Sequence, residues 1–158
     1  MLSTPTEEHD MYGDTSVIRG LARTMRDQAA DIRHEADRLV AHAESVHWSG
    51  LAADTLRRRS RDRAADLRRT AALHDDAADA LDHHADEVDR LKDLIASIER
   101  RVQGLVVGAR DRLAELGRGI LDGIRHVAPD PLDQLLDRFV PPPSGSKDWL
   151  DVEIPGLH

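Results

Sequence analysis

Cysteine is absent from this chain, aromatic residues make up only 3% of it, and lysine occurs only at Lys92 and Lys147. The missing thiols exclude disulfide bonds, cysteine nucleophiles and cysteine-ligated zinc. Uninterrupted apolar runs, such as Leu105-Val106-Val107, are far shorter than the ~20 residues that a membrane-spanning helix needs. We therefore expect no stable membrane insertion.

What the chain does contain is alanine, leucine and charge. Of its 158 residues, 40% are hydrophobic and 33% are charged, and the formal net charge is -8. An apolar content dominated by alanine and leucine is typical of long helices rather than of a sandwich or barrel. The composition predicts an all-α fold.

A first long helix is expected after a polar N-terminal segment. Residues 1–13 show no apolar period and no features of a Sec signal peptide, which predicts a flexible tail. The stretch Gly13-Asp14-Thr15-Ser16 offers helix N-cap residues. Beyond it, apolar residues recur at steps of three and four, as in a coiled-coil seam. The seam residues are Ile18, Leu21, Met25, Ala29, Ile32, Ala36, Leu39, Ala43 and Val46.

The seam is interrupted at His47-Trp48-Ser49-Gly50 and then resumes. Serine and glycine favour a turn, so we expect an elbow at Trp48, Ser49 and Gly50, with the indole ring of Trp48 sealing the end of the core. The second part of the seam contains Ala53, Leu56, Ser60, Leu67, Ala71, His74, Ala78, Leu81, Ala85 and Val88. The pattern predicts a long antiparallel hairpin over residues 14–103.

An elbow at Trp48-Ser49 predicts that facing residues have numbers that add up to about 98. In that register, the basic run Arg57–Arg69 lies beside Asp31, Glu35 and Asp37. The acidic run Asp75–Asp82 lies beside arginines of the first helix. The apolar seam and the charges thus support the same hairpin.

Residues 104–140 predict further amphipathic helices that extend the hairpin in the manner of a bundle. Five glycines punctuate this part of the chain, and we expect a break at Gly104 or Gly108 followed by a third helix. Its apolar stripe runs from Ile98 to Val127. Pro131–Val140 predicts a short fourth helix, with proline in its first turn. Residues 141–158 predict a Pro/Ser/Gly linker and then a C-terminal peptide, either a short strand or a docking segment.

With its Trp-x-Gly elbow between two seamed helices, the chain resembles the WxG-type hairpins of bacterial type VII (ESX) secretion. Gly13-Asp14-Thr15-Ser16-Val17-Ile18 is similar to the start of the N-terminal secretion-signal domains of actinobacterial type VII substrates. The resemblance covers about half of the chain, from Gly13 to Leu91. It implies a non-enzymatic module that pairs with another hairpin protein, in a homodimer or heterodimer, to form a four-helix bundle. It also implies recognition by the secretion machinery, and secretion or attachment to the cell envelope without a Sec signal peptide.

The chain departs from this family at the export motif, a tyrosine followed four residues later by an acidic residue. The only tyrosine, Tyr12, is followed at that spacing by Ser16. His83 and Glu87 have the same spacing near the end of the paired segment and are the candidate export-signal position. The alternative is that a partner supplies the signal.

Other functional hypotheses have less support in the sequence. Asp79 with His83, and Asp31 with His34, have helical metal-ligand spacing, but the hairpin register separates them, so we expect neither a metal nor a cofactor. We expect His74 to be a satisfied seam histidine; a pH-sensitive contact is the alternative. The Arg57–Arg69 run lacks interleaved aromatics and has acidic neighbours, which argues against nucleic acid and favours an intramolecularly paired face. No catalytic motif is present.

The sequence therefore favours a type VII secretion substrate or adaptor. A non-secreted helical scaffold or coiled-coil dimer is the alternative from another class, and a membrane-active helical protein is a weaker one.

Overall fold

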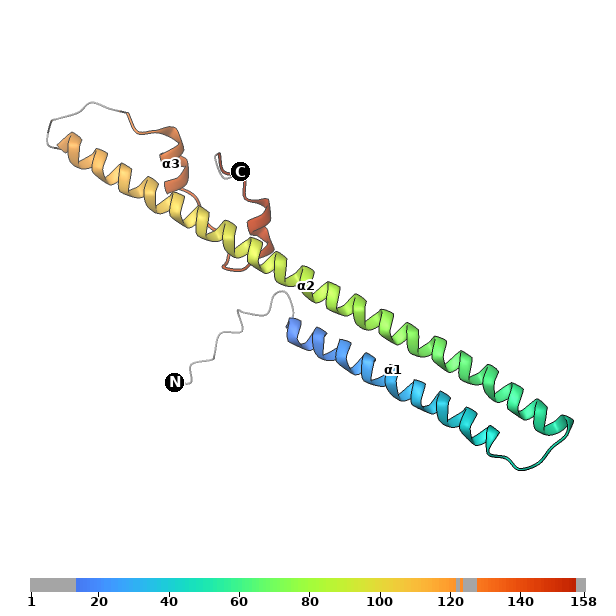
Figure 1. Ribbon diagram of the computed structural model, residues 1–158. Coiled ribbons are helices and arrows are strands. Elements are labelled where there is room, and N and C mark those ends of the chain that lie inside the picture. The colour runs from blue at the N-terminus through green and yellow to red at the C-terminus, as the bar shows by residue number, and fades with distance from the viewer. Residues whose placement is uncertain (1–13, 122, 124–127, 156–158) are drawn as a thin grey trace, which may run out of the picture. The chain divides into compact units, whose positions relative to one another are not determined.

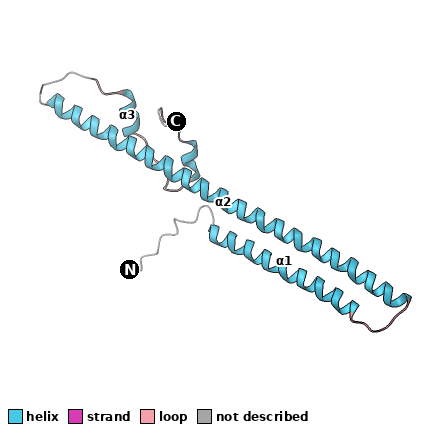
Figure 2. Ribbon diagram, viewed as in Figure 1, coloured by secondary structure: helices cyan, strands magenta, loops and turns pink. Residues whose placement is uncertain are grey.

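A computed structural model describes residues 14–121, 123 and 128–155. It contains α1 (Thr15–Glu44), α2 (Leu51–Leu121), α3 (Pro131–Asp137) and a 3-10 helix, η1 (Lys147–Asp151), with no strand in these ranges (Figures 1 and 2). The all-α prediction is confirmed. The chain forms two compact units: the hairpin Asp14–Asp89, and a second unit from Arg90 onward. The predicted tail 1–13 and the predicted stripe residues Ile124 and Val127 lie outside the described residues.

Helix α1 begins where the sequence predicts. The side chain of Asp14 accepts a hydrogen bond from the backbone N–H of Ser16 at 2.8 Å and is the N-cap. This carboxylate satisfies one of the free amides of the first turn.

Small residues form the buried interface of the hairpin. Those of α1 recur every seven residues: Ala22, Ala29, Ala36 and Ala43. Those of α2 are Ala53, Ser60, Ala64, Ala71, Ala78 and Ala85. Larger seam residues alternate with them and are half-buried, namely Ile18, Met25, Ile32, Leu39, Leu67, His74, Leu81 and Val88. The heptad pattern is that of a coiled coil in which one of the two core positions is almost always alanine.

Two residues predicted for the seam, Leu21 and Leu56, each lie one position before the residue that occupies the interface. Leu21 is half exposed, whereas its neighbour Ala22 is buried. Leu56 is also exposed, and Arg57 occupies the corresponding position of α2. Strict alternation of four and three steps from Ile18 to Met25 requires residue 22. Spacing along the helix, rather than side-chain size, therefore decides which residue enters the interface.

Ion pairs between the two helices give the register. Arg19 pairs with Asp86, Arg26 with Asp79, Asp37 with Arg68, and Glu44 with Arg61. In each of these four pairs the two residue numbers add up to 105, so the predicted sum of about 98 is wrong by one heptad. A slip of seven residues returns every seam position to an equivalent one, which is why the apolar pattern alone does not exclude it.

The sign of the charges reverses along the hairpin. Toward its open end, arginines of α1 contact aspartates of α2, as Arg26 does with Asp79 and Asp82 at 2.7 and 2.8 Å. Toward the elbow, carboxylates of α1 contact arginines of α2. This confirms the predicted pairing of opposite charges. Exposed pairs are individually weak, so their main effect is to select one register among the heptad-related ones.

Helix α2 continues without a break through Gly104 and Gly108, so the separate third helix expected after them is the C-terminal part of α2. Each glycine lowers helix propensity by roughly 1 kcal/mol relative to alanine. The packing of Ile95, Val102 and Ala109, which are buried at seven-residue intervals, outweighs that cost. Leu136, Trp149 and Ile154 complete this core.

The expected fourth helix forms as α3, and ion pairs attach it to α2. Arg112 donates to both carboxylate oxygens of Asp133, from Nε to Oδ1 at 3.1 Å and to Oδ2 at 3.0 Å, and from Nη2 to Oδ1 at 2.5 Å. Arg110 also contacts Asp137 at 3.3 Å. The Asp130 side chain caps α3 by accepting from the Leu132 N–H.

The stretch 141–146, predicted as a linker, is an ordered part of the second unit. Gly145, with φ of 73°, makes a turn, and its N–H donates to Glu99 at 3.3 Å. The Trp149 indole then reaches the core and donates a hydrogen bond to the Pro143 carbonyl at 2.9 Å. The C-terminal peptide is therefore a docking segment that begins as a 3-10 helix, because Trp149 and Ile154 are buried in the core of the second unit.

Enlarging one interface alanine should destabilise the hairpin. We expect Ala71→Leu to lower the free energy of unfolding by about 1–3 kcal/mol, because the buried site has no space for an isobutyl group. Ala77→Leu, at an exposed position of the same helix, is the matched control and should change stability by less than about 0.5 kcal/mol. Urea denaturation followed by circular dichroism measures both, and equal losses would contradict the packing described here.

The contact of Asp133 with Arg112 should make the second unit sensitive to acid. Hydrogen bonding from Arg112 lowers the pKa of Asp133 below 3.8. Its stabilising effect is therefore complete above that pH and is lost as the pH falls through the lowered folded-state pKa. Asp133→Asn should lower the melting temperature near pH 7, and the difference from wild type should shrink below about pH 3.8. The melting temperature is measured by Trp149 fluorescence in a Trp48→Phe background. A difference between Asp133→Asn and wild type that persists unchanged to pH 2 would contradict a stabilising role of the Asp133 carboxylate.

Candidate functional site

The elbow is the part of the hairpin with the most distinctive surface. Helix α1 ends at Glu44, Ser45 caps it, and the loop continues to Gly50, where φ is 105°. A left-handed backbone conformation favours glycine, so Gly50 forms the turn that the sequence predicts at Ser49 and Gly50. The loop lies beside the first turns of α2, since Val46 and Trp48 both contact Arg57. That asymmetric path accounts for the one-heptad difference in register.

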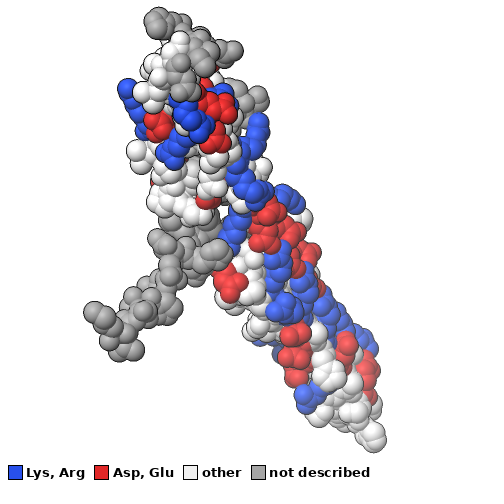
Figure 3. All heavy atoms as spheres, turned by 90° about the vertical axis from the view of Figure 1, so that its left-hand side faces the viewer, with Lys and Arg blue, Asp and Glu red and all other residues white. Residues whose placement is uncertain are grey.

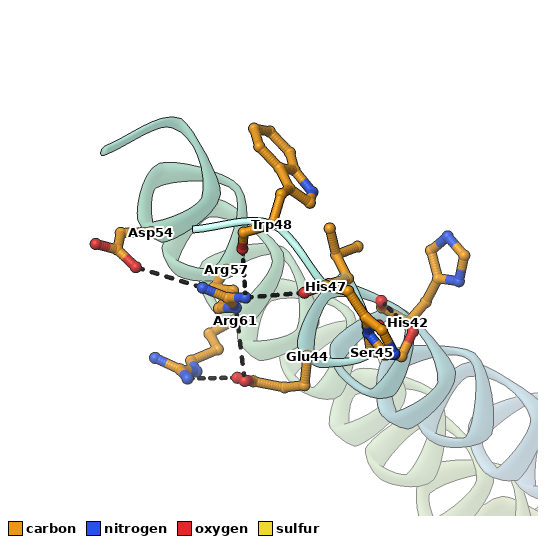
Figure 4. A network of polar contacts seen from close by, with 9 residues as sticks. His42, Glu44, Ser45, His47, Trp48, Asp54, Arg57 and Arg61 are labelled. Atoms are coloured by element: carbon orange, nitrogen blue, oxygen red, sulfur yellow. Dashed lines mark hydrogen bonds and ion pairs between the residues drawn. The ribbon is translucent and has the colours of Figure 1, made fainter. Parts of the chain in front are cut away.

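Arg57 holds the elbow together (Figure 4). Its Nη2 donates to the carbonyl oxygens of Val46 at 3.1 Å and Trp48 at 3.3 Å, and its Nη1 contacts Asp54 at 3.4 Å. Its side chain is only 23% exposed. A guanidinium can satisfy several carbonyl oxygens at once, because it carries five donors in a fixed plane. Sequence reasoning missed this role, although the seam spacing from Ala53 to Ser60 indicates position 57.

Trp48 does not seal the core, contrary to expectation. Trp48 is 49% exposed, and its ring points away from the Arg57 network (Figure 4). An interface closed by Ala43, Ala53 and Ser60 has little room for an indole between the helices. The ring instead contributes to a shallow open hollow of about 570 Å³, whose lining is Trp48, Leu51, Ala52, Thr55, Leu56 and Arg59.

The arginine run of α2 is divided between two environments. Arg57, Arg61, Arg68 and Arg69 pair with carboxylates, as predicted for an intramolecularly satisfied face. Arg58, Arg59 and Arg63 make no ion pair or hydrogen bond with any described residue. Toward the end of the hairpin away from the elbow, the hydrogen bonds that Arg19 donates to Asp86 and Asp89 raise the pKa of Arg19, and those that Arg26 donates to Asp79 and Asp82 raise the pKa of Arg26.

The other predicted site residues lie outside the elbow. His83 and Glu87 are exposed one turn apart on α2. His74 is half-buried at its seam position, and its Nδ1 lies 2.9 Å from the carbonyl oxygen of Thr70, so its ring is hydrogen-bonded within its own helix. Asp79, one of the carboxylates considered for a metal, is paired with Arg26. Within the described ranges, no group of three or more potential metal ligands comes together.

Comparison of the chain with models of known protein families, with curated proteins and with solved structures gave no match. The elbow exposes apolar side chains next to Arg59, which makes no ion pair or hydrogen bond with a described residue. None of the helices in the described part of the chain has the length and apolar character to cross a membrane.

The two tryptophans allow a direct test of their environments. We expect Trp149→Ala to lower the free energy of unfolding by about 3–5 kcal/mol, because Trp149 is only 1% exposed. Trp48→Ala should change it by about 0.5 kcal/mol or less, as at other surface positions. Urea denaturation of the two variants makes the comparison. A large loss from Trp48→Ala would show that the ring is buried.

Proposed function

We propose that the hairpin is a non-enzymatic docking module that pairs with a second helical hairpin into a four-helix bundle. In this proposal the pairing serves type VII secretion, with the chain acting as substrate or adaptor. The observation that carries the docking role is that the ion pairs between α1 and α2 occupy one flank of the hairpin only.

The geometry of this flank follows from the helical repeat of about 100° per residue. Arg19, Arg26 and Arg33 each precede a buried alanine of α1 by three residues, and all three contact aspartates of α2. Leu21 precedes Ala22 by one residue, so it projects from the opposite flank. The same reasoning applied to α2 places Ala77 and Leu73 on that side.

This second flank, which we call the open flank, carries exposed apolar groups. Its members Val17, Leu21 and Leu73 are each at least half exposed. None of the ion pairs between described residues of α1 and α2 crosses it. Apolar side chains beside small residues on a polar helix pair are suited to helix packing against a partner.

The resemblance to WxG-type hairpins supports the link to secretion. Trp48, Ser49 and Gly50 lie in the loop between two long helices, as the family pattern requires. The candidate export position, His83 and Glu87, is exposed and accessible to a receptor. Export through this route would place the protein outside the cytoplasm or at the cell envelope without a Sec signal peptide.

The alternative is a non-secreted scaffold in which the open flank pairs two copies of this chain. The weaker membrane-active hypothesis has less support, because Ile98, Val102 and Leu105 of the proposed apolar stripe pack in the core of the second unit.

The docking role can be tested by placing charge on the open flank. We expect Leu21→Glu combined with Leu73→Glu to weaken association with a co-expressed WxG-type hairpin protein at least tenfold, through desolvation of the new carboxylates. Leu94→Glu combined with Val107→Glu is the control, since Leu94 is 50% exposed like Leu21 but belongs to the second unit. Co-purification and sedimentation velocity measure the association.

The secretion role needs a separate readout. The chain should appear in the culture medium only when the type VII secretion ATPase is intact, and His83→Ala with Glu87→Ala should abolish export without affecting helicity. Self-association through the open flank, together with ATPase-independent retention inside the cell, would support the scaffold instead.

A further inference from the structure

The end of the hairpin exposes a cluster of large apolar side chains. Leu51 is 84% exposed, Trp48 is 49% exposed and Leu56 is 38% exposed. They border the same open hollow, with Ala52 and Thr55 between them. In Figure 3 the elbow end of the hairpin, at the bottom, is largely white, and acidic and basic side chains lie along the helices above it. Clustered apolar groups rimmed by charge commonly mark a binding surface.

Unpaired arginines continue this face along α2. Arg59 lines the hollow and Arg63 lies one turn farther along the same face, since residues 52, 56, 59 and 63 follow helical spacing. Both are exposed, and neither makes an ion pair with a described residue. Their neighbours Arg57 and Arg61 are both held by Glu44. The free positive charge therefore lies beside the apolar cluster.

We infer that the elbow is a peripheral docking site for an anionic lipid bilayer. Trp48 and Leu51 enter the headgroup region, and Arg59 and Arg63 contact lipid phosphates. A tryptophan with one exposed face suits the membrane interface, where its ring is solvated by apolar groups and its N–H by polar ones. Arginine side chains next to such a group add attraction to anionic headgroups.

A bilayer fits these observations better than an acidic protein segment does. The hollow is shallow and open, it lies at a loop between helices, and it offers neither a groove nor a strand edge for a peptide. A bilayer surface is fluid and can accommodate the projecting elbow without a complementary groove. The net charge of -8 does not cancel this attraction, because charges beyond a Debye length of about 8–10 Å are largely screened. This inference goes beyond the docking role. Arg59 and Arg63 have the same heptad positions as Leu73 and Ala77, so the lipid site lies where the open flank reaches the elbow, outside the stretch that contains Leu21 and Leu73.

The test is binding of the full-length protein to vesicles of phosphatidylglycerol and phosphatidylcholine, compared with phosphatidylcholine alone. We expect co-sedimentation with the anionic vesicles only, a blue shift of Trp48 emission, and quenching of that emission by lipids brominated near the headgroup. Arg59→Gln with Arg63→Gln should weaken binding about 25-fold, from about fivefold for each arginine near the surface. Leu51→Gln should weaken it further without changing helicity.

Matched control variants distinguish lipid binding by the elbow from non-specific adsorption of the protein to vesicles. Arg100→Gln with Arg101→Gln removes the same charge from two exposed arginines of the second unit that make no ion pair with a described residue. Val140→Gln replaces a residue that, like Leu51, is 84% exposed. Both should bind as the wild type does. Equal loss in elbow and control variants, equal binding to neutral vesicles, or no binding at all would overturn the inference. So would a dimer abolished by Leu51→Gln, which would assign the patch to a second copy.

The open-flank variant Leu21→Glu with Leu73→Glu should still bind vesicles. Failure of the vesicle experiment would therefore leave the proposed hairpin pairing unaffected, and failure of pairing would leave the lipid site unaffected.

Discussion

The hairpin depends on alanine at every seventh position of its interface. Ala22, Ala29 and Ala36 present almost no side chain to α2, and Ala71 and Ala78 present almost none to α1. Such an interface buries little apolar area per residue, so its stability depends on length and on unhindered packing of the two helices. It also specifies register weakly, because equivalent small residues recur along it. The charges on the ion-paired flank supply the specificity that alanine lacks.

The same constraint explains the elbow. Because small residues close the interface at this end, the Trp48 ring lies outside and Arg57 satisfies the loop carbonyls that an apolar plug would leave unpaired. The side chain of Arg57 thus occupies the inside of the elbow and the Trp48 ring its outside, which is the opposite of the arrangement expected from the sequence. Because the Trp48 ring lies outside, the elbow has an exposed apolar surface that is available to another molecule.

Much of the fold could be predicted from local patterns, and what could not depends on contacts between distant residues. The Asp14 cap, the two long helices, the glycine turn and most seam positions follow from spacing and turn chemistry. The register could not be predicted in this way, because a one-heptad slip preserves the seam. It is decided by the path of the loop beside α2 and by the ion pairs between the two helices. The continuity of α2 through Gly104 and the burial of Trp149 both depend on the core formed with the C-terminal peptide. At the site, the Trp-x-Gly elbow was found from sequence, whereas the role of Arg57 was not, because its loop acceptors have no sequence signature.

Pairing within the chain distinguishes the arginines that stabilise the hairpin from those available to a partner. In the sequence, Arg57–Arg69 is a single basic segment, but on a helix its side chains project in three different directions. Arg61 and Arg68 face α1 and are neutralised there. Arg59 lies beside Trp48 and Leu56, and Arg63 follows one turn farther along α2; neither makes an ion pair with a carboxylate of the described residues. A chain with net negative charge can therefore present a locally cationic, apolar tip, because each acidic side chain near the elbow other than Asp62 is already engaged by an arginine. It is this local imbalance, rather than the overall charge, that decides what the elbow attracts.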